Sequence, residues 1–305
     1  MEKSEGKREI ALTKRQLARV EKIELVRTAR DEGQQDVGYT SRPFTLTSLP
    51  IRRPPKGQLI HERRNGNFRL QVVGHPQYGL PWGVDRLVIL WTATAAVRQK
   101  SRIIRFRSGA DILREFGLPL DGRTYRRLVD SFKRVFGAQV FFGTDGEAAR
   151  ANVFNTAKFS FFDSIRLWCT PHDLEATTLP GDFENEIQLS ETFWKELQAH
   201  PLPVDMNMVR AFKNSPGLLD FSLWLTWRCW KARGAESLPL FGVGGLVHQL
   251  GVEGYESERK FRQTLRRWLT SIRATWPHCP AVISADGERL ELSHAKAIKA
   301  PKSST

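Results

Sequence analysis

Two segments of this 305-residue chain, near residues 130 and 265, show the same amphipathic pattern. Apolar residues recur at positions i, i+4, i+7 and i+8: Leu128, Phe132, Val135 and Phe136 in the first segment, and Phe261, Leu265, Trp268 and Leu269, with Ile272 beyond them, in the second. Each residue advances about 100° around a helix, so this spacing gathers the apolar side chains in one stripe and leaves arginines opposite. The chain must therefore fold so that it buries two such stripes.

The surroundings of the two segments repeat as well. The first half predicts a helix capped by Asp85, a strand, a short helix ending at Gly117, the arginine-rich helix, and a hairpin formed by residues 139–143 and 153–162. The second half predicts the same order, with a helix capped by Asp220. Matching positions are displaced by 133 to 135 residues: Asp85 to Asp220, Ile103 to Leu238, Gly117 to Gly251 and Phe132 to Leu265. This order is that of a winged helix, a helix-turn-helix followed by a β-hairpin called the wing.

The predicted fold class is therefore α+β, with two tandem winged-helix (helix-turn-helix) domains related by an internal pseudo-repeat. The predicted parts are a charged N-terminal arm (1–42), a first winged-helix domain with a leading β-hairpin (43–165), an acidic linker (166–185), a second winged-helix domain (186–297) and a disordered tail (298–305). The arm has partial helical periodicity, so a helix on a partner or on the DNA duplex and a mobile arm are equally compatible with its sequence.

The charge of the chain indicates a polyanionic partner. The formal net charge is +14 at pH 7 and the calculated pI is about 10.0. Arginine suits phosphates and guanine edges, since its planar fork donates two parallel hydrogen bonds. In a helix-turn-helix the last helix enters the major groove, which makes the two arginine-rich helices the predicted DNA-binding elements.

The predicted DNA-binding residues divide between the two helices. In the second helix Arg259, Gln263 and Arg267 form a row that could read bases, and Lys260 and Arg266 flank it where phosphates would lie. The first helix presents Arg123, Arg126, Arg127 and Arg134. Asp130 lies in the middle of that face and would repel phosphate, so the second helix is the better candidate for base readout.

Signals for other classes of protein are weak. The chain has no Gly-x-x-x-x-Gly-Lys-[Ser/Thr] phosphate-binding loop, and its cysteines and histidines do not form a zinc-ligand set, so we expect neither catalysis, nor a cofactor, nor a metal. The His61-Glu62-Arg63-Arg64 run matches the His-x-x-Arg of tyrosine recombinases, but it begins a predicted strand, the wrong place for that chemistry. Three scattered cysteines, a charged N-terminus and the lack of a long apolar run predict a cytoplasmic protein.

Several short motifs resemble the plasmid-encoded RepA replication initiators. They are Gly79-Leu80-Pro81-Trp82-Gly83, then Asp85-Arg86-Leu87, Leu90-Trp91-Thr92-Ala93, Arg98-x-Lys100-Ser101, Leu113-x-x-Phe116-Gly117-Leu118 and Tyr125-Arg126-Arg127-Leu128. The resemblance spans about residues 45–295. It implies two winged-helix domains that bind direct repeats (iterons) at a plasmid origin, help to open the duplex, and recruit the host initiator and replicative helicase. It also implies homodimers, formed through the N-terminal domain, that repress their own gene.

Other functions remain open from the sequence. A DNA-binding transcriptional repressor with no role in initiation would have the same charge pattern. A strand-transferring or nicking enzyme would use Tyr125 or Tyr255 as its nucleophile. A protein–protein assembly domain would carry basic faces only for solubility.

Overall fold

A computed structural model describes residues 14–65, 68–144, 155–167, 185–242, 244–250, 257–296 and 298. The fold is mixed α and β, as the sequence predicts. Its helices are α1 (Lys14–Asp31), α2 (Arg42–Leu46), α3 (Asp85–Gln99), α4 (Gly109–Glu115), α5 (Gly122–Gly137), α6 (Glu191–Ala199), α7 (Met206–Phe212), α8 (Pro216–Lys231), α9 (Leu246–Leu250) and α10 (Glu258–Thr275). Its strands are β1 (Val37–Ser41), β2 (Ile60–Asn65), β3 (Phe68–Val73), β4 (Ile103–Phe106), β5 (Gln139–Thr144), β6 (Asn155–Ser160), β7 (Phe162–Arg166), β8 (Asn185–Leu189), β9 (Pro201–Asp205), β10 (Glu236–Pro239), β11 (Val282–Ile283) and β12 (Arg289–Leu292).

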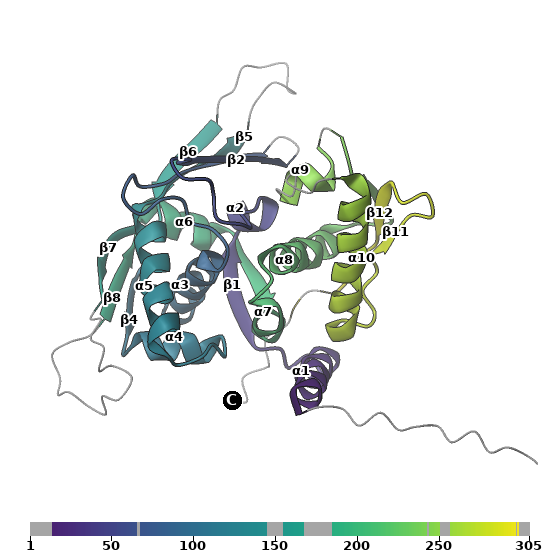
Figure 1. The fold of residues 1–305 in the computed structure, drawn as a ribbon, viewed down its shortest axis with the longest axis horizontal. Helices are drawn as coiled ribbons and strands as arrows, with labels where there is room; N and C mark the ends of the chain where they lie inside the picture. Colours follow the sequence, from purple (N-terminus) through teal and green to yellow (C-terminus); the bar gives the residue numbers. More distant parts are fainter. Residues whose placement is uncertain are drawn as a thin grey trace, which may run out of the picture.

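The same sequence of elements occurs twice. The first unit consists of α3, β4, α4, α5, β7 and β8, and the second of α8, β10, α9, α10, β11 and β12. Each unit has one three-stranded antiparallel sheet, in the order β4-β8-β7 in the first and β10-β12-β11 in the second. In both sheets the strand after the first helix pairs with the last strand of the unit. Figure 1 shows the first unit on the left and the second on the right.

The prediction that residues 139–143 and 153–162 form the hairpin of the first unit is wrong. Residues 139–144 and 155–160 do pair as β5 and β6, but they extend the predicted β2–β3 hairpin into a four-stranded sheet of order β2-β3-β5-β6. The strands that pair with β4 are instead β7 and β8. The acidic stretch 166–185, predicted to link two domains, therefore connects two strands of the first unit. The sequence misleads here because β5–β6 is an insertion without a counterpart in the second half.

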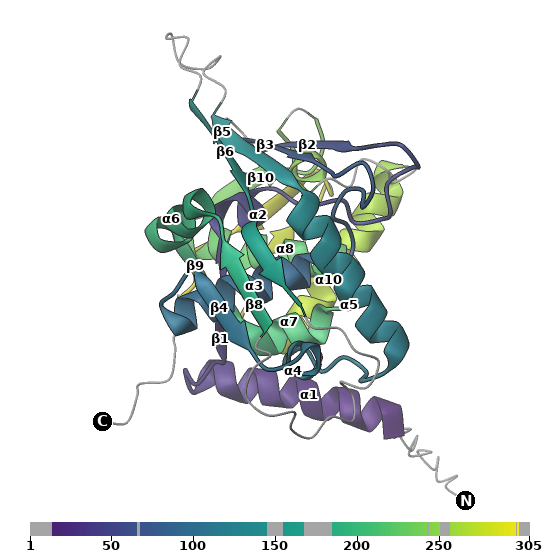
Figure 2. The ribbon, with the colours of Figure 1, turned by 90° about the vertical axis from the view of Figure 1, so that its left-hand side faces the viewer.

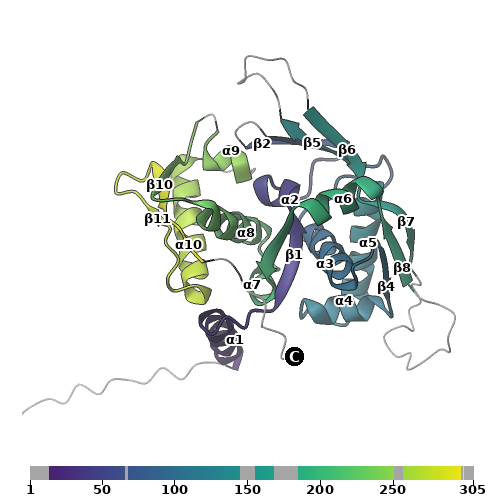
Figure 3. The same ribbon diagram turned by 180° about the vertical axis from the view of Figure 1, so that it is seen from behind.

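The first helix of each unit forms the centre of the molecule. Helices α3 and α8 are buried on nearly all sides, as expected for helices that are apolar around their whole circumference. Thr92 Oγ1 donates to the Val88 carbonyl and Thr226 Oγ1 to the Ser222 carbonyl within their own helices, whereas Thr94 Oγ1 donates to the Tyr39 carbonyl of β1. Strand β1 pairs with β9 and packs on α3, and Figure 3 shows this strand between the two units.

Two predicted helix caps have other roles. Helix α8 begins at Pro216 after Ser215, so Asp220 lies inside the helix and is buried. Asp85 is the first residue of α3 rather than its cap, and its carboxylate accepts a hydrogen bond from the Trp82 N–H at 2.9 Å. The predicted stop at Gly117 is confirmed, because this residue has a φ of +57° directly after α4. Gly251 lies outside the described residues.

Residues 14–41 are part of the folded body. Helix α1 packs against α7 and α10, and the Arg30 guanidinium lies 4.0 Å from the centre of the Trp276 ring at the end of α10. Burial lowers the pKa of Arg30. Because β1 also pairs with β9, residues 14–41 are not a detached arm, and Val26 of α1 is buried.

Candidate nucleic-acid interface

Helix α10 presents the basic face predicted for it. Its N-terminus is capped by Ser257, whose Oγ accepts from the Lys260 N–H at 3.3 Å. All five apolar residues predicted to form its stripe are buried: Phe261, Leu265, Trp268, Leu269 and Ile272. The five predicted contact residues are all exposed: Arg259, Lys260, Gln263, Arg266 and Arg267. The 3.6-residue period alone therefore sorted this helix correctly.

Two further arginines of α10 have structural partners and fix the helix to its sheet. Arg262 donates from Nε to the Gly287 carbonyl at 2.9 Å, pairs with Glu288, and lies over the Phe241 ring. Arg273 donates to the Ala281 carbonyl at 2.6 Å. These contacts hold the hairpin β11–β12 beside α10, so the exposed arginines lie on a helix with a fixed orientation.

Helix α5 is only partly as predicted. Asp121 caps it by accepting from the Thr124 N–H at 2.7 Å, and this hydrogen bond lowers the pKa of Asp121. Arg123, Arg126 and Arg127 are exposed as expected, and so is Asp130. The predicted stripe is shorter than expected because its last residue, Phe136, is 37% exposed.

Arg134 is a structural residue rather than part of an open basic face. Its Nε and Nη2 donate to the two carboxylate oxygens of Asp85, at 2.6 and 2.8 Å, and Asp85 is fully buried. Burial would lower the pKa of Arg134, but the hydrogen bonds and charge of Asp85 outweigh it and raise that pKa. Ser131 Oγ also donates to Asp85 at 2.5 Å. This cluster fastens α5 to the start of α3, so Arg134 is withdrawn from the predicted DNA contacts.

One basic residue of α5 was missed from the sequence. Lys133 is exposed and lies seven residues after Arg126, two helical turns along the same face. The same spacing that identified the apolar stripe could have found it.

The two basic helices lie on the same side of the molecule. Figure 1 shows α5 and α10 on opposite flanks with α3 and α8 between them, and Figure 2 shows both on one side, with α6 on the other. Helix α5 runs from α4 toward β5, whereas α10 runs from α9 toward α1, so the two helices point in opposite directions in Figure 1. Two exposed cationic helices are thus presented together on one face.

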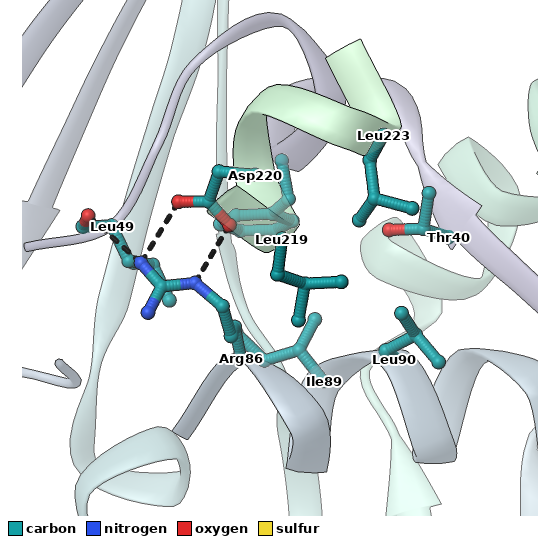
Figure 4. A pocket seen from close by; sticks show the side chains of 9 residues that line it. Thr40, Leu49, Arg86, Ile89, Leu90, Leu219, Asp220 and Leu223 are labelled. Atoms are coloured by element: carbon teal, nitrogen blue, oxygen red, sulfur yellow. Dashed lines mark hydrogen bonds and ion pairs between the residues drawn. The ribbon is translucent and has the colours of Figure 1, made fainter. Parts of the chain in front are cut away.

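A buried ion pair joins the two units. Arg86 of α3 and Asp220 of α8 pair with Nε and Oδ1 2.7 Å apart, and Arg86 Nη2 also donates to the Leu49 carbonyl at 3.1 Å (Figure 4). Burial raises the pKa of Asp220 to about 6, and the Arg86 charge offsets only part of this effect. The adjoining cavity, lined also by Ile89 and Leu219, measures about 20 Å³, room for little more than one water. The pair therefore holds the units together and is not a ligand site.

The side chains considered for catalysis lie in structural positions wherever the structure describes them. The Tyr125 ring packs against Gly109, where a Cβ would come within 2.6 Å of the ring, and Tyr255 lies outside the described residues. Cys229 and Cys279 are buried free thiols, and burial raises the pKa of Cys229 to about 12. His61 is buried and hydrogen-bonded to the Ser48 carbonyl, which makes it a structural histidine at the start of β2.

The described residues contain no group of three or more histidine, cysteine, aspartate or glutamate side chains placed to hold a metal ion. Nor is any of their helices both long and apolar enough to cross a membrane.

Comparison with known families gives one match. Residues 121–238 match the family described as plasmid encoded RepA protein. The matched segment runs from the cap of α5 through most of β10 and includes the Tyr125-Arg126-Arg127-Leu128 motif. The resemblance drawn from the motifs is thereby confirmed over this segment. No curated protein matches the chain.

The fold is similar to that of domains 2 and 3 of RctB. A crystal structure of selenomethionine derivatives of these domains has a TM-score of 0.50 and 12% sequence identity, and the likeness covers 83% of this chain and 96% of that one. A second crystal structure of the same two domains has a TM-score of 0.45 and 13% identity, covering 80% of this chain and 92% of that one. At such low identity the first likeness shows the fold only.

Proposed function

We propose that this RepA-like chain binds double-stranded DNA sequence-specifically at the direct repeats of a plasmid origin and initiates plasmid replication there. It would help to open the duplex and recruit the host initiator and replicative helicase, without catalysis of its own. The observation that carries the proposal is the pair of exposed basic helices, α5 and α10, on one side of a molecule that matches the RepA family. The same proposal places the protein in the cytoplasm, associated with the nucleoid or the plasmid. It also includes a homodimer formed through the first unit.

The proposal treats each unit as a winged helix. Helices α4–α5 and α9–α10 would be the two helix-turn-helix pairs, and the hairpins β7–β8 and β11–β12 the two wings. The shared order of elements and of strands in the two sheets supports this assignment. Helices α5 and α10 would then enter successive major grooves, about one helical turn or roughly 34 Å apart.

The second unit is the better candidate for reading bases. On α10 the exposed arginines and Gln263 form one continuous row, and arginine pairs with guanine while glutamine pairs with adenine. On α5 the exposed Asp130 interrupts the row, and Arg134 is bound to Asp85. Helix α5 would therefore mainly hold the DNA backbone.

The proposal is tested by selecting duplexes from a random-sequence pool with the full chain and footprinting the best of them. Two units in successive grooves should protect a site approaching two helical turns, about 20 base pairs. A footprint of only half a turn would contradict the proposal. So would the absence of binding, or binding whose affinity does not fall as salt is added. Replication of an origin-bearing plasmid that depends on the gene separates an initiator from a repressor. A covalent protein–DNA adduct that is lost in Tyr125→Phe or Tyr255→Phe would instead support the alternative of a strand-transferring or nicking enzyme.

A further inference from the structure

A third basic element lies outside the two helices. Residues 47–59 connect α2 to β2, and we call the part from 50 to 59 the central loop. The loop carries Arg52, Arg53 and Lys56 and has no acidic residue. All three cations are exposed, and none forms a hydrogen bond or ion pair with another residue that the structure describes. In contrast, Arg134 and Arg262 of the two helices have carboxylate partners.

The base of the central loop is fixed at the junction of the two units. The Pro50 carbonyl accepts a hydrogen bond from the Gly83 N–H at 2.9 Å, just before α3. Ile51 reaches the other unit, since a Cβ on Gly217 of α8 would lie 3.2 Å from Ile51 Cδ1 and 2.7 Å from Trp268 of α10. The Gly79-Leu80-Pro81-Trp82-Gly83 motif therefore helps to hold this loop. In Figure 2 the chain between α2 and β2 extends on the side where α5 and α10 lie.

The conformation of the central loop is restricted. Pro54 and Pro55 each limit φ to about −65°. The Gln58 N–H then donates to the Pro55 carbonyl at 3.1 Å, and Gly57 at the third position of this turn has a φ of +87°. That is the geometry of a type II turn, which favours glycine at this position. Lys56 stands at its tip, so the backbone that carries the three cations has little conformational entropy left to lose on binding.

We infer that the central loop binds the DNA phosphates between the two grooves that α5 and α10 occupy. This inference rests on the proposed function. Two helices in successive major grooves leave a stretch of backbone between them, and the loop begins at the boundary of the two units. Three cations without carboxylate partners favour phosphate contacts, which add affinity to any sequence and give binding its salt dependence. The loop would thus set the register of the two helices without reading bases.

The test is a triple variant, Arg52→Gln/Arg53→Gln/Lys56→Gln, of the full chain on the selected duplex and on an unrelated duplex. We expect binding of both duplexes to weaken at least tenfold, with the ratio between them unchanged. The slope of log affinity against log salt should fall by about 2 to 3, since each phosphate contact contributes about 0.9. Ethylation of phosphates at the centre of the site should interfere with the wild-type chain and no longer with the variant.

A matched control is Lys56→Gln against Lys195→Gln. Lys195 is an exposed lysine of α6, on the other side of the molecule in Figure 2, so its loss should leave the salt slope unchanged. The inference is overturned if the triple variant keeps the wild-type salt slope and the wild-type ethylation interference at the centre of the site. If Arg259→Ala weakens binding in the same experiment, the proposed function stands although the inference about the loop has failed. If the wild-type chain binds no duplex, both fall. Circular dichroism checks that the loop variant is folded.

Discussion

The two units have the same elements but fasten their basic helices differently. In the first unit a buried carboxylate, Asp85, draws Arg134 and Ser131 of α5 onto the start of α3. In the second unit a continuous apolar stripe holds α10 in place, and Arg262, one of its two structural arginines, bonds to the adjoining hairpin. Helix α5 therefore loses a cation to the interior, whereas α10 keeps its outward row. The same helix pattern in sequence thus serves attachment in one unit and display in the other.

The largest difference should appear in stability when Asp85 or Arg134 is changed. Removing one partner of a buried ion pair leaves the other charge without compensation, which costs about 3–5 kcal/mol. We expect Arg134→Ala to lower the free energy of unfolding by about 3 kcal/mol, because its guanidinium is partly exposed. Arg259→Ala on α10 should change it by less than about 0.5 kcal/mol. Urea denaturation measures both, and equal effects would contradict the division between attachment and display.

The apolar stripes give the second comparison. Leu265 of α10 is fully buried, so Leu265→Ala should cost about 2–5 kcal/mol through lost burial and the cavity left behind. Phe136 occupies the end of the predicted stripe of α5 but is 37% exposed, and Phe136→Ala should cost about 1–2 kcal/mol. A thermal melt of each variant checks this order. A larger loss of stability for Phe136→Ala would mean that α5, like α10, is held in place by a continuous buried apolar stripe.

The third comparison concerns acid. Burial lowers the pKa of His61 to about 4, below its ordinary 6.5, so the unfolded chain takes up a proton between these values and the folded chain does not. The contribution of His61 to stability should therefore fall as the pH drops from 6.5 through 4, by up to about 3 kcal/mol in total. Asp220, whose pKa burial raises to about 6, acts in the opposite direction over this range, so the effect of His61 is isolated by comparing variants. The effect should loosen the contact of β2 with α9, because His61 holds the Ser48 carbonyl and Ser48 Oγ donates to the Leu250 carbonyl.

The control for acid is His61→Gln, whose amide can donate to Ser48 but does not titrate. In denaturation experiments the free energy of unfolding should fall less between pH 7 and pH 5 in this variant than in the wild type. If both lose the same stability, another group is responsible for the acid sensitivity.

Much of the fold followed from periodicity, because a helix with a buried stripe has a signature within its own sequence. The order helix, strand, helix, helix in both halves and the exposed face of α10 were predicted in this way. Pairing between distant segments has no such signature. The sequence could not show that β4 pairs with β8 rather than with β5, that Asp220 pairs with Arg86, or that Arg134 turns toward Asp85. Each depends on residues at least 49 positions apart, brought together only by the folded core.

The most direct test of the account is to compare Arg259→Ala and Arg267→Ala with Arg126→Ala and Arg127→Ala on the selected duplex and on versions with single base changes. For the α10 variants we expect a loss of about 1–3 kcal/mol of binding free energy and a weaker preference for the base that the missing side chain contacted. The α5 variants should weaken binding of all the duplexes alike, and their salt slope should fall by about one. Base preference that is lost with Arg126 or Arg127 and kept without Arg259 and Arg267 would contradict the assignment of α10 as the reading helix.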